Sequence, residues 1–241
     1  MYDLTTFSLQ EMTRCSSVLR RLGHQAESME DAASRIVRYL YDQLIDSQTG
    51  EKSCALVRLF ATQPYQELDT DLRAFANTML GGEPESSTMK CLTLMATVGD
   101  KVEWNTRRRS AEHKAIPLPS PKAVEKLPMI TQLVNQFGLD VSTVLRPDPS
   151  LLVDVEQKTY NVFYVPEALG SPYVPAQKDF VIPFDIQSVL GFGGMLPSGN
   201  LFAVIMFSKI HIQRETAEMF KTLSLSAKVA LLPFVNGKIF T

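Results

Sequence analysis

The stretch SVLGFGGMLPSGNLFAVIMFSKIHIQRETAEMFKTLSLSAKVALL, residues 188–232, decides the fold. Ser188–Phe192 and Leu201–Ser208 are short apolar runs of the kind that form buried strands. The glycines and the proline between them supply turn chemistry, so a β-hairpin is predicted. The segment Gln213–Leu232 then follows the helical period, with its apolar side at Phe220, Leu223, Ala227, Ala230 and Leu231. A hairpin closed by a long helix is therefore expected.

Helix and strand signals also follow one another upstream of the hairpin. Met29–Ile45 carries an apolar stripe at helical spacing, and Ser28 is placed to cap its N-terminus. Ser53–Thr62 and Met89–Val98 are short, apolar and predicted to be strands, with the helical pattern of Tyr65–Leu80 between them. The first half of the chain is thus predicted to be helix, strand, helix, strand.

The middle of the chain is less regular. Ile116–Pro121 carries three prolines in six residues and must be extended or looped. Glu125–Gly138 has the apolar face of a helix, Thr159–Val165 alternates like a strand, and Phe180–Phe184 reads as a short extended run. Because strands do not alternate regularly with helices, a doubly wound parallel sheet is disfavoured. We predict an α+β fold, with a central, mostly antiparallel sheet flanked by N- and C-terminal helices.

The layout resembles the GAF domain and its relative the PAS domain, which are small-molecule sensing modules of bacterial signalling proteins. The resemblance lies in the helix ending LYDQLIDSQTG with the strand CALVRLFAT after it, and in the hairpin and helix of residues 188–232. It implies a single sensor domain over residues 28–241, with an insertion near 104–158. Residues 1–27, which include a second predicted helix at Phe7–Leu22, are then an N-terminal helical extension.

Composition and charge exclude several classes of protein. The net charge of −2 disfavours a nucleic-acid binder, which would carry a basic face. No apolar run reaches roughly 18 residues, so no membrane insertion is expected. The three cysteines form no CxxC pair, and with only three histidines present neither a metal site nor a dithiol motif is predicted. The start of the chain lacks a basic, then apolar, signal pattern, so a cytoplasmic location is expected.

Two charged residues are candidates for ligand contact. Arg58 is the one charged residue in its apolar strand, on the side of Cys54, Leu56 and Phe60 if the strand is regular. If buried, Arg58 needs an anionic partner, either a ligand or a structural salt bridge. His113 lies in the polar loop RRRSAEHKAIPLPS, where it could contact a ligand or ligate a haem at the mouth of a pocket, or simply be an exposed or locally hydrogen-bonded loop histidine.

The arginine run and an aromatic cluster supply further candidates. Arg107–Arg109 could clamp an acidic ligand or a phosphate, although a solvated basic face or a contact with a partner is the simpler interpretation. Further along the chain, aromatic side chains lie near Asn161 and Gln177 in the sequence; they are Tyr160, Phe163, Tyr164 and Tyr173. Such a set is typical of an apolar pocket with a few polar groups, and equally of a hydrophobic core. The candidate ligand-binding residues are Arg58, His113, Tyr160, Asn161, Tyr164 and Tyr173.

The GAF subtypes whose ligands are known carry characteristic residue patterns, and these patterns can be looked for in the sequence. The Asp-Glu pair expected of cyclic-nucleotide-binding GAF domains is missing, and no cysteine adjoins a histidine as expected for a bilin-binding photoreceptor. The sequence therefore names no cofactor, no metal and no catalytic residue. The leading hypothesis is a non-enzymatic sensor of a small molecule or a protein partner, a homodimer through its terminal helices, which acts on an output domain. The alternatives are a small, possibly hydrolytic enzyme that uses His113, and a ligand-free scaffold or dimerisation domain.

Overall fold

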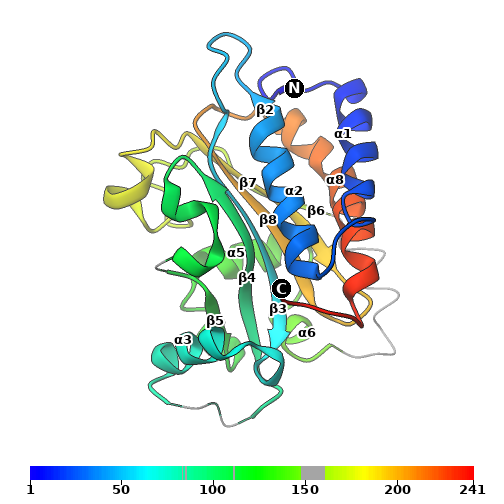
Figure 1. Ribbon diagram of the computed structural model, residues 1–241. Helices are drawn as coiled ribbons and strands as arrows, with labels where there is room; N and C mark the ends of the chain where they lie inside the picture. The colour runs from blue at the N-terminus through cyan, green and yellow to red at the C-terminus, as the bar shows by residue number, and fades with distance from the viewer. Residues whose placement is uncertain (83, 85, 111, 148–160) are drawn as a thin grey trace.

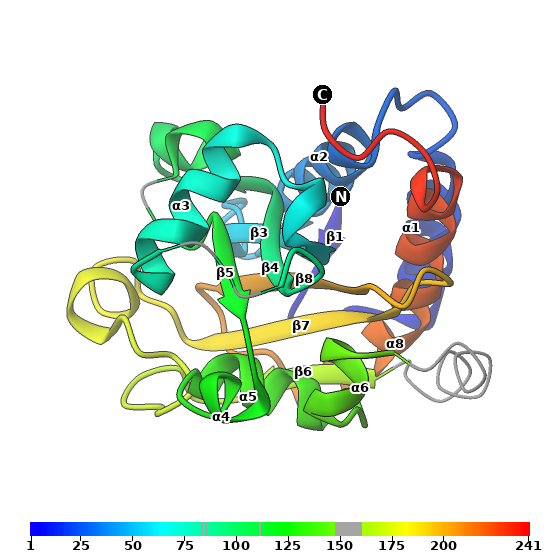
Figure 2. The ribbon, with the colours of Figure 1, turned by 90° about the horizontal axis from the view of Figure 1, so that it is seen from below.

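The computed structural model describes residues 1–82, 84, 86–110, 112–147 and 161–241, and has three layers (Figures 1 and 2). Its middle layer is an antiparallel sheet in the order β5-β4-β3-β8-β7-β6. The strands are β3 (Cys54–Pro64), β4 (Lys90–Gly99), β5 (Ala115–Leu118), β6 (Asn161–Val165), β7 (Ser188–Met195) and β8 (Leu201–Ser208). The predicted α+β class with a mostly antiparallel sheet is confirmed.

The predicted hairpin is present, and its second strand, β8, lies at the centre of this sheet. β7 and β8 pair from Ser188 with Ser208 to Met195 with Leu201. The turn closes when the amide of Leu196 donates to the carbonyl of Asn200 at 2.8 Å, and Gly199 adopts the left-handed φ of 75° that the turn requires. β8 then pairs along its other edge with β3, so strands from the two ends of the chain are neighbours at the middle of the sheet.

Gly193 of β7 occupies a position that admits no side chain. A Cβ atom there would lie 2.1 Å from the carbonyl oxygen of Phe202 and 2.9 Å from the Cα of Ala203, both backbone atoms of β8. We expect Gly193→Ala to force the hairpin strands apart and to destabilise the protein by about 1–3 kcal/mol or more. Unfolding in urea measures this loss as the decrease in the free energy of unfolding. Gly82→Ala is the matched control, because nothing lies within 4 Å of its Cβ, and an equal loss in both variants would contradict the prediction.

Three helices cover one face of the sheet. They are α1 (Leu9–Arg21), α2 (Met29–Gln43) and α8 (Arg214–Leu231), and α1 packs directly on α8 (Figure 1). Ser8 and Glu11 form a capping box at the start of α1, and Ser28 caps α2 by accepting from the amide of Asp31. The predicted N-cap of α2 is therefore confirmed.

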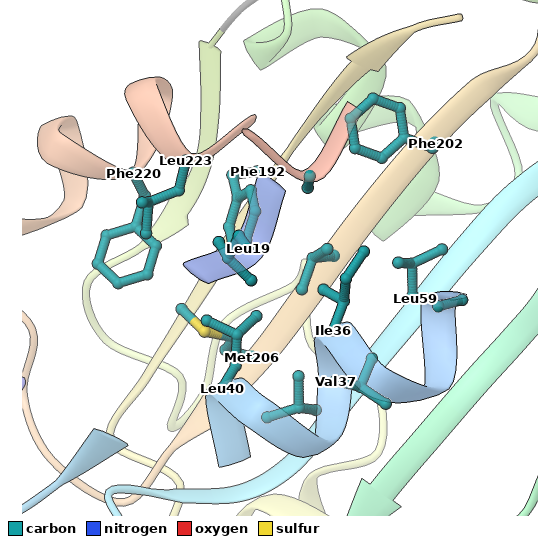
Figure 3. Packing of buried hydrophobic residues seen from close by; sticks show 14 of the residues in the cluster. Leu19, Ile36, Val37, Leu40, Leu59, Phe192, Phe202, Met206, Phe220 and Leu223 are labelled. Atoms are coloured by element: carbon teal, nitrogen blue, oxygen red, sulfur yellow. The ribbon is translucent and has the colours of Figure 1, made fainter. Parts of the chain in front are cut away.

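The apolar sides of these helices and the sheet enclose the largest core cluster, part of which is drawn in Figure 3. Phe220 of α8 lies between Phe7 and Phe192, with ring centroids 5.3 Å and 5.6 Å apart. Residues ahead of α2 belong to this same core, because Leu4, Phe7 and Leu19 have no more than 2% exposure. A short parallel pair, β1 (Tyr2–Asp3) with β2 (Leu44–Ile45), ties the N-terminus to the end of α2. The domain boundary at residue 27/28 stays a prediction.

The opposite face is covered by shorter elements, α4 (Pro121–Val124), α5 (Pro128–Gln136) and α6 (Val141–Leu145), seen below the sheet in Figure 2. They enclose a second core cluster, whose sheet residues include Leu56, Phe60, Phe163 and Ile205. A third, small cluster lies under α3 (Thr70–Leu80), close to β5. The helix predicted over Glu125–Gly138 thus begins at Pro128, because proline favours the first turn of a helix.

Three local expectations are wrong, each for a physical reason. Phe180–Phe184 is not extended: Gln177–Val181 forms a π-helical turn, and the Gln177 amide donates to the carbonyls of Ala168 and Val174. Tyr65–Leu80 is not one helix, since a 3₁₀ turn precedes Asp69, the N-cap of α3. Cys54 does not share a face with Arg58, because the pairing of β3 with β8 shifts between Cys54 and Leu56.

Candidate functional site

Arg58 lies near the middle of the central strand β3. It pairs with Thr97 of β4 on one side and with Ile205 of β8 on the other. Since directly paired residues point to the same face of a sheet, Arg58, Thr97 and Ile205 share a face. That face belongs to the second core cluster, which includes Leu56 and Phe60 on either side of Arg58. A cation is therefore set among apolar residues at the centre of the sheet.

One side-chain atom of each residue in this pair is buried without a hydrogen bond. The Nε of Arg58 and the Oγ1 of Thr97 are both buried without a hydrogen bond, and Thr97 is only 5% exposed. Among the described residues, no carboxylate lies within 4.0 Å of the Arg58 guanidinium. Burial lowers the pKa of Arg58 to about 10, so the group still carries its positive charge at neutral pH. The structural salt bridge considered for Arg58 is not found in this part of the chain.

His113 lies close enough to Arg58 for the two charges to interact. Partial loss of solvent lowers the pKa of His113, the positive charge of Arg58 lowers it further, and Glu112 opposes both effects. The imidazole is therefore neutral at pH 7. Its side chain is 50% exposed, and its backbone has a left-handed φ of 62°, a conformation uncommon for residues other than glycine. His113 thus stands at the rim of the Arg58 site and not within it.

The loop that carries His113 is held by one hydrogen bond to the sheet and by two within the loop itself. The amide of Leu94 donates to the carbonyl of Lys114 at 2.8 Å, just past the β4–β5 pairing. The Ser110 hydroxyl donates to the carbonyl of Glu112 at 2.9 Å, and the Lys114 ammonium donates to the carbonyl of Arg108 at 3.0 Å. Lys114 is consequently occupied within its own loop. The site then consists of Arg58, Thr97, Glu112 and His113, which we call the Arg58 cluster.

The other predicted site residues lie elsewhere. The Tyr164 hydroxyl donates to the carbonyl of Ile212, on the face covered by α8. Asn161, at the start of the edge strand β6, uses its side-chain oxygen to accept from the amide of Val162. Tyr173 is half-buried against the second core cluster. Tyr160 lies outside the described residues. Of the six candidates, the structure brings together Arg58 and His113.

The expectation of a solvated face for Arg107–Arg109 is wrong at its first member. Arg107 is buried and forms a two-bond pair with Glu30, at 2.7 Å and 3.0 Å, and a third bond to Asp69 at 2.9 Å. Its guanidinium also lies 5.0 Å from the ring centroid of Phe240. Burial acts to lower the pKa of Arg107, but these carboxylates raise it above its usual value. Its partners are far away in sequence, so the sequence carries no signal for this network.

A small cleft opens at the edge of β4 that β5 leaves unpaired. It has a volume of about 130 Å³ and lies between α2 and residues 105–107, with Thr97 in its lining. Its polar lining groups, Glu30, Arg38 and Arg107, already bond to other protein groups. Thr97 belongs to the lining of this cleft, whereas Arg58, Glu112 and His113 do not.

The described residues offer little for metal or nucleophilic chemistry. Within them, no group of three or more His, Cys, Asp or Glu residues is arranged to hold a metal ion. All three cysteines are buried and unpaired, and burial raises the pKa of each thiol to about 12, so none is a thiolate at neutral pH. The helices that are described include none long and apolar enough to cross a membrane.

The hydrolytic alternative required His113 in a deep pocket beside a carboxylate or a nucleophile. The side chain of His113 is instead half exposed, and the carboxylate nearest to it is that of its neighbour Glu112, with 3.8 Å between Nδ1 and Oε2. That distance exceeds a hydrogen bond, and the Glu112 side chain is 78% exposed. A general base needs its partner within hydrogen-bond reach, so this geometry does not favour acid–base catalysis by His113.

Comparison with known proteins gives only a distant likeness. No protein-family profile and no curated protein sequence match the chain. Among solved structures, the chromophore-binding domain of an unusual bacteriophytochrome from R. palustris aligns over 94% of this chain and 63% of its own length, with 9% identity and a TM-score of 0.38. A longer structure of a bacteriophytochrome from the same bacterium aligns over 92% and 39%, again with 9% identity and a TM-score of 0.38. The chain thus spans less than two thirds of these proteins, and function must be inferred from the site itself.

Proposed function

We propose that this domain is a regulatory sensor that binds a small molecule at the Arg58 cluster and acts through its terminal helices, α1 and α8. The observation that carries this proposal is the partly buried Arg58 side chain at the centre of the sheet, whose Nε is buried without a hydrogen bond and which has no carboxylate within 4.0 Å among the described residues. A charged group that loses part of its hydration without gaining a counter-ion lowers the stability of the fold, so a fold optimised for stability alone would replace it. Perturbed charges of this kind concentrate at functional sites.

The two faces of the sheet support a division between binding and output. The face under α1, α2 and α8 is packed with apolar side chains, whereas the opposite face holds the Arg58 cluster. Strand β3 connects them, because Arg58 points to one face and its neighbours Val57 and Leu59 belong to the cluster under the helices. A ligand that moves or orders Arg58 therefore acts on a strand in direct contact with the helical layer.

In such a module, the signal passes to a domain or protein that responds to the positions of α1 and α8. We propose a role of this kind in signal transduction, as the resemblance to GAF and PAS domains implies. In this chain the two helices pack on each other, so their outward surfaces are what a partner would meet. Homodimerisation through those surfaces and a cytoplasmic location stay predictions.

The proposal is tested with the wild-type chain and with Arg58→Met, which keeps the length of the side chain and removes its charge. We expect a small molecule, co-purified or selected from a metabolite library, to be detected by native mass spectrometry on the wild type and not on Arg58→Met. The variant itself should be at least as stable in thermal unfolding, because it no longer buries a lone charge.

The matched control is Arg108→Met, which changes an exposed arginine in the loop that carries His113. It should retain the wild-type ligand. The proposal would be overturned if no compound distinguished the wild type from Arg58→Met, or if the two arginine variants lost binding equally. Hydrogen exchange in α1 and α8, measured with and without the selected compound, then tests whether binding reaches the terminal helices.

A further inference from the structure

The hydrogen-bonding groups of the Arg58 cluster define what kind of ligand it can take. The guanidinium is a planar fork of donors, and the Thr97 hydroxyl lies directly across the strand pair from it, unpartnered and on the same face. The Nε donor of Arg58 is buried without a hydrogen bond, and among the described residues no carboxylate lies within 4.0 Å of the guanidinium. The site therefore has an excess of donors, and a complementary ligand supplies acceptors.

The charges around the cluster set the charge of that ligand. Arg58 contributes one positive charge, and Lys114 is engaged with the carbonyl of Arg108. His113 is neutral at pH 7, and the Glu112 carboxylate at the rim contributes a negative field. One cation beside one peripheral anion favours a singly charged ligand over a dianion, because a second negative charge would face Glu112 without compensation.

The remaining surroundings are apolar. Leu56, Phe60 and Ile205, which flank Arg58 on its own strand and on β8, carry no hydrogen-bonding side chain. Ligand atoms next to the charged group therefore meet hydrocarbon, which favours an aliphatic or aromatic body over a sugar or a nucleotide.

We infer that the ligand of this domain is a small carboxylic acid with an apolar body, bound as its carboxylate to Arg58 and Thr97. This inference rests on the proposed function and names the ligand class of the same site. Two parallel N–H···O bonds from the guanidinium match the two carboxylate oxygens, and the Thr97 hydroxyl donates a third bond. The ligand thereby replaces the missing counter-ion of Arg58 and the missing acceptor of Thr97 together.

The experiment uses benzoate and acetate as probes, with phosphate, sulfate and chloride compared at matched ionic strength. Affinity is measured by titration of the fluorescence of Trp104, the single tryptophan, and by thermal shift. Trp104 is a suitable reporter, because it packs over Gly99, which pairs with Leu56 beside the cluster. Benzoate should bind more tightly than acetate, since its ring buries additional apolar area.

The variants separate the contributions of charge, fork and hydroxyl. Arg58→Met should weaken the binding of benzoate at least about tenfold, since it removes hydrogen bonds to a charged group. Arg58→Lys keeps the positive charge but lacks the two parallel N–H donors of the guanidinium, so it should restore only part of the affinity that Arg58→Met loses. Thr97→Val, nearly isosteric without the hydroxyl, should weaken binding by about fivefold. Arg108→Met should bind like the wild type.

The outcomes distinguish this inference from the proposed function. If phosphate or sulfate binds as tightly as benzoate with the same dependence on Arg58, the carboxylate assignment is wrong while the sensor site stands. If no anion depends on Arg58 but a neutral library compound does, the anion inference is wrong and the proposed function again stands. If no compound of any class depends on Arg58, both are overturned.

Discussion

Arg107→Met is expected to destabilise the protein by about 3–5 kcal/mol, the usual cost of leaving a buried carboxylate without its cation. The Arg107 side chain is 5% exposed and that of Glu30 is 15% exposed, so water cannot replace the lost hydrogen bonds effectively. The variant also releases Asp69, the N-cap of α3, and the contact with Phe240. Chemical denaturation of the wild type and of Arg107→Met measures the difference in the free energy of unfolding.

Two further variants test the cause of that loss. Arg108→Met alters the exposed neighbour and should change stability by no more than about 0.5 kcal/mol. Adding Glu30→Gln to Arg107→Met removes the stranded charge and should restore part of the lost stability. A loss that is no larger in Arg107→Met than in Arg108→Met would show that the network does not hold α2, α3 and the C-terminal segment together.

Phe220→Ala is expected to cost about 3–5 kcal/mol, because the ring fills space between α8, the N-terminal segment and β7. Phe220 is fully buried, and its ring contacts those of Phe7 and Phe192 at the centroid distances given above. Figure 3 shows Phe220 and Phe192 in this core. Truncation leaves a cavity that neither a helix nor a central strand can collapse to fill. For a chain of this size the melting temperature should fall by roughly 6–20 °C in calorimetry.

The matched control for Phe220→Ala lies on the same helix. Leu225 is 41% exposed, so Leu225→Ala should lower the melting temperature by only a degree or two. A similar fall in both variants would contradict the assignment of Phe220 to the core. The comparison also measures how firmly α8 is held, which matters if α8 transmits a signal.

The fold was largely accessible from the sequence because its main elements carry strong local patterns. The apolar runs of β7 and β8 and the period of α8 predict a hairpin and a closing helix, and Ser28 marks the start of α2. Prediction failed where side-chain hydrogen bonds within a loop overrode the local pattern. The π-helical turn at Gln177 depends on the carbonyls of Ala168 and Val174, which no periodicity reveals.

The site could be predicted only in part. An arginine in an apolar strand is visible in the sequence, and so is a histidine in a polar loop. That the charges of Arg58 and His113 interact depends on the course of the loop after β4, which the hydrogen bond between Leu94 and Lys114 fixes to the sheet. Thr97 was missed, because a threonine in a strand is unremarkable until its cross-strand partner is known. Tyr164 and Tyr173 were proposed together, but the sheet separates them.

The pairing of β3 with β8 at the centre of the sheet has a consequence for how the chain acquires its structure. Cys54 pairs with Ser208, so one edge of β3 stays open during synthesis until the C-terminal third has left the ribosome. Domains with such non-local pairing fold slowly, and open strand edges in their intermediates are prone to aggregation. Nascent chains truncated before β8 should therefore depend on chaperones, and production of the domain should be most efficient when translation of this last third is rapid.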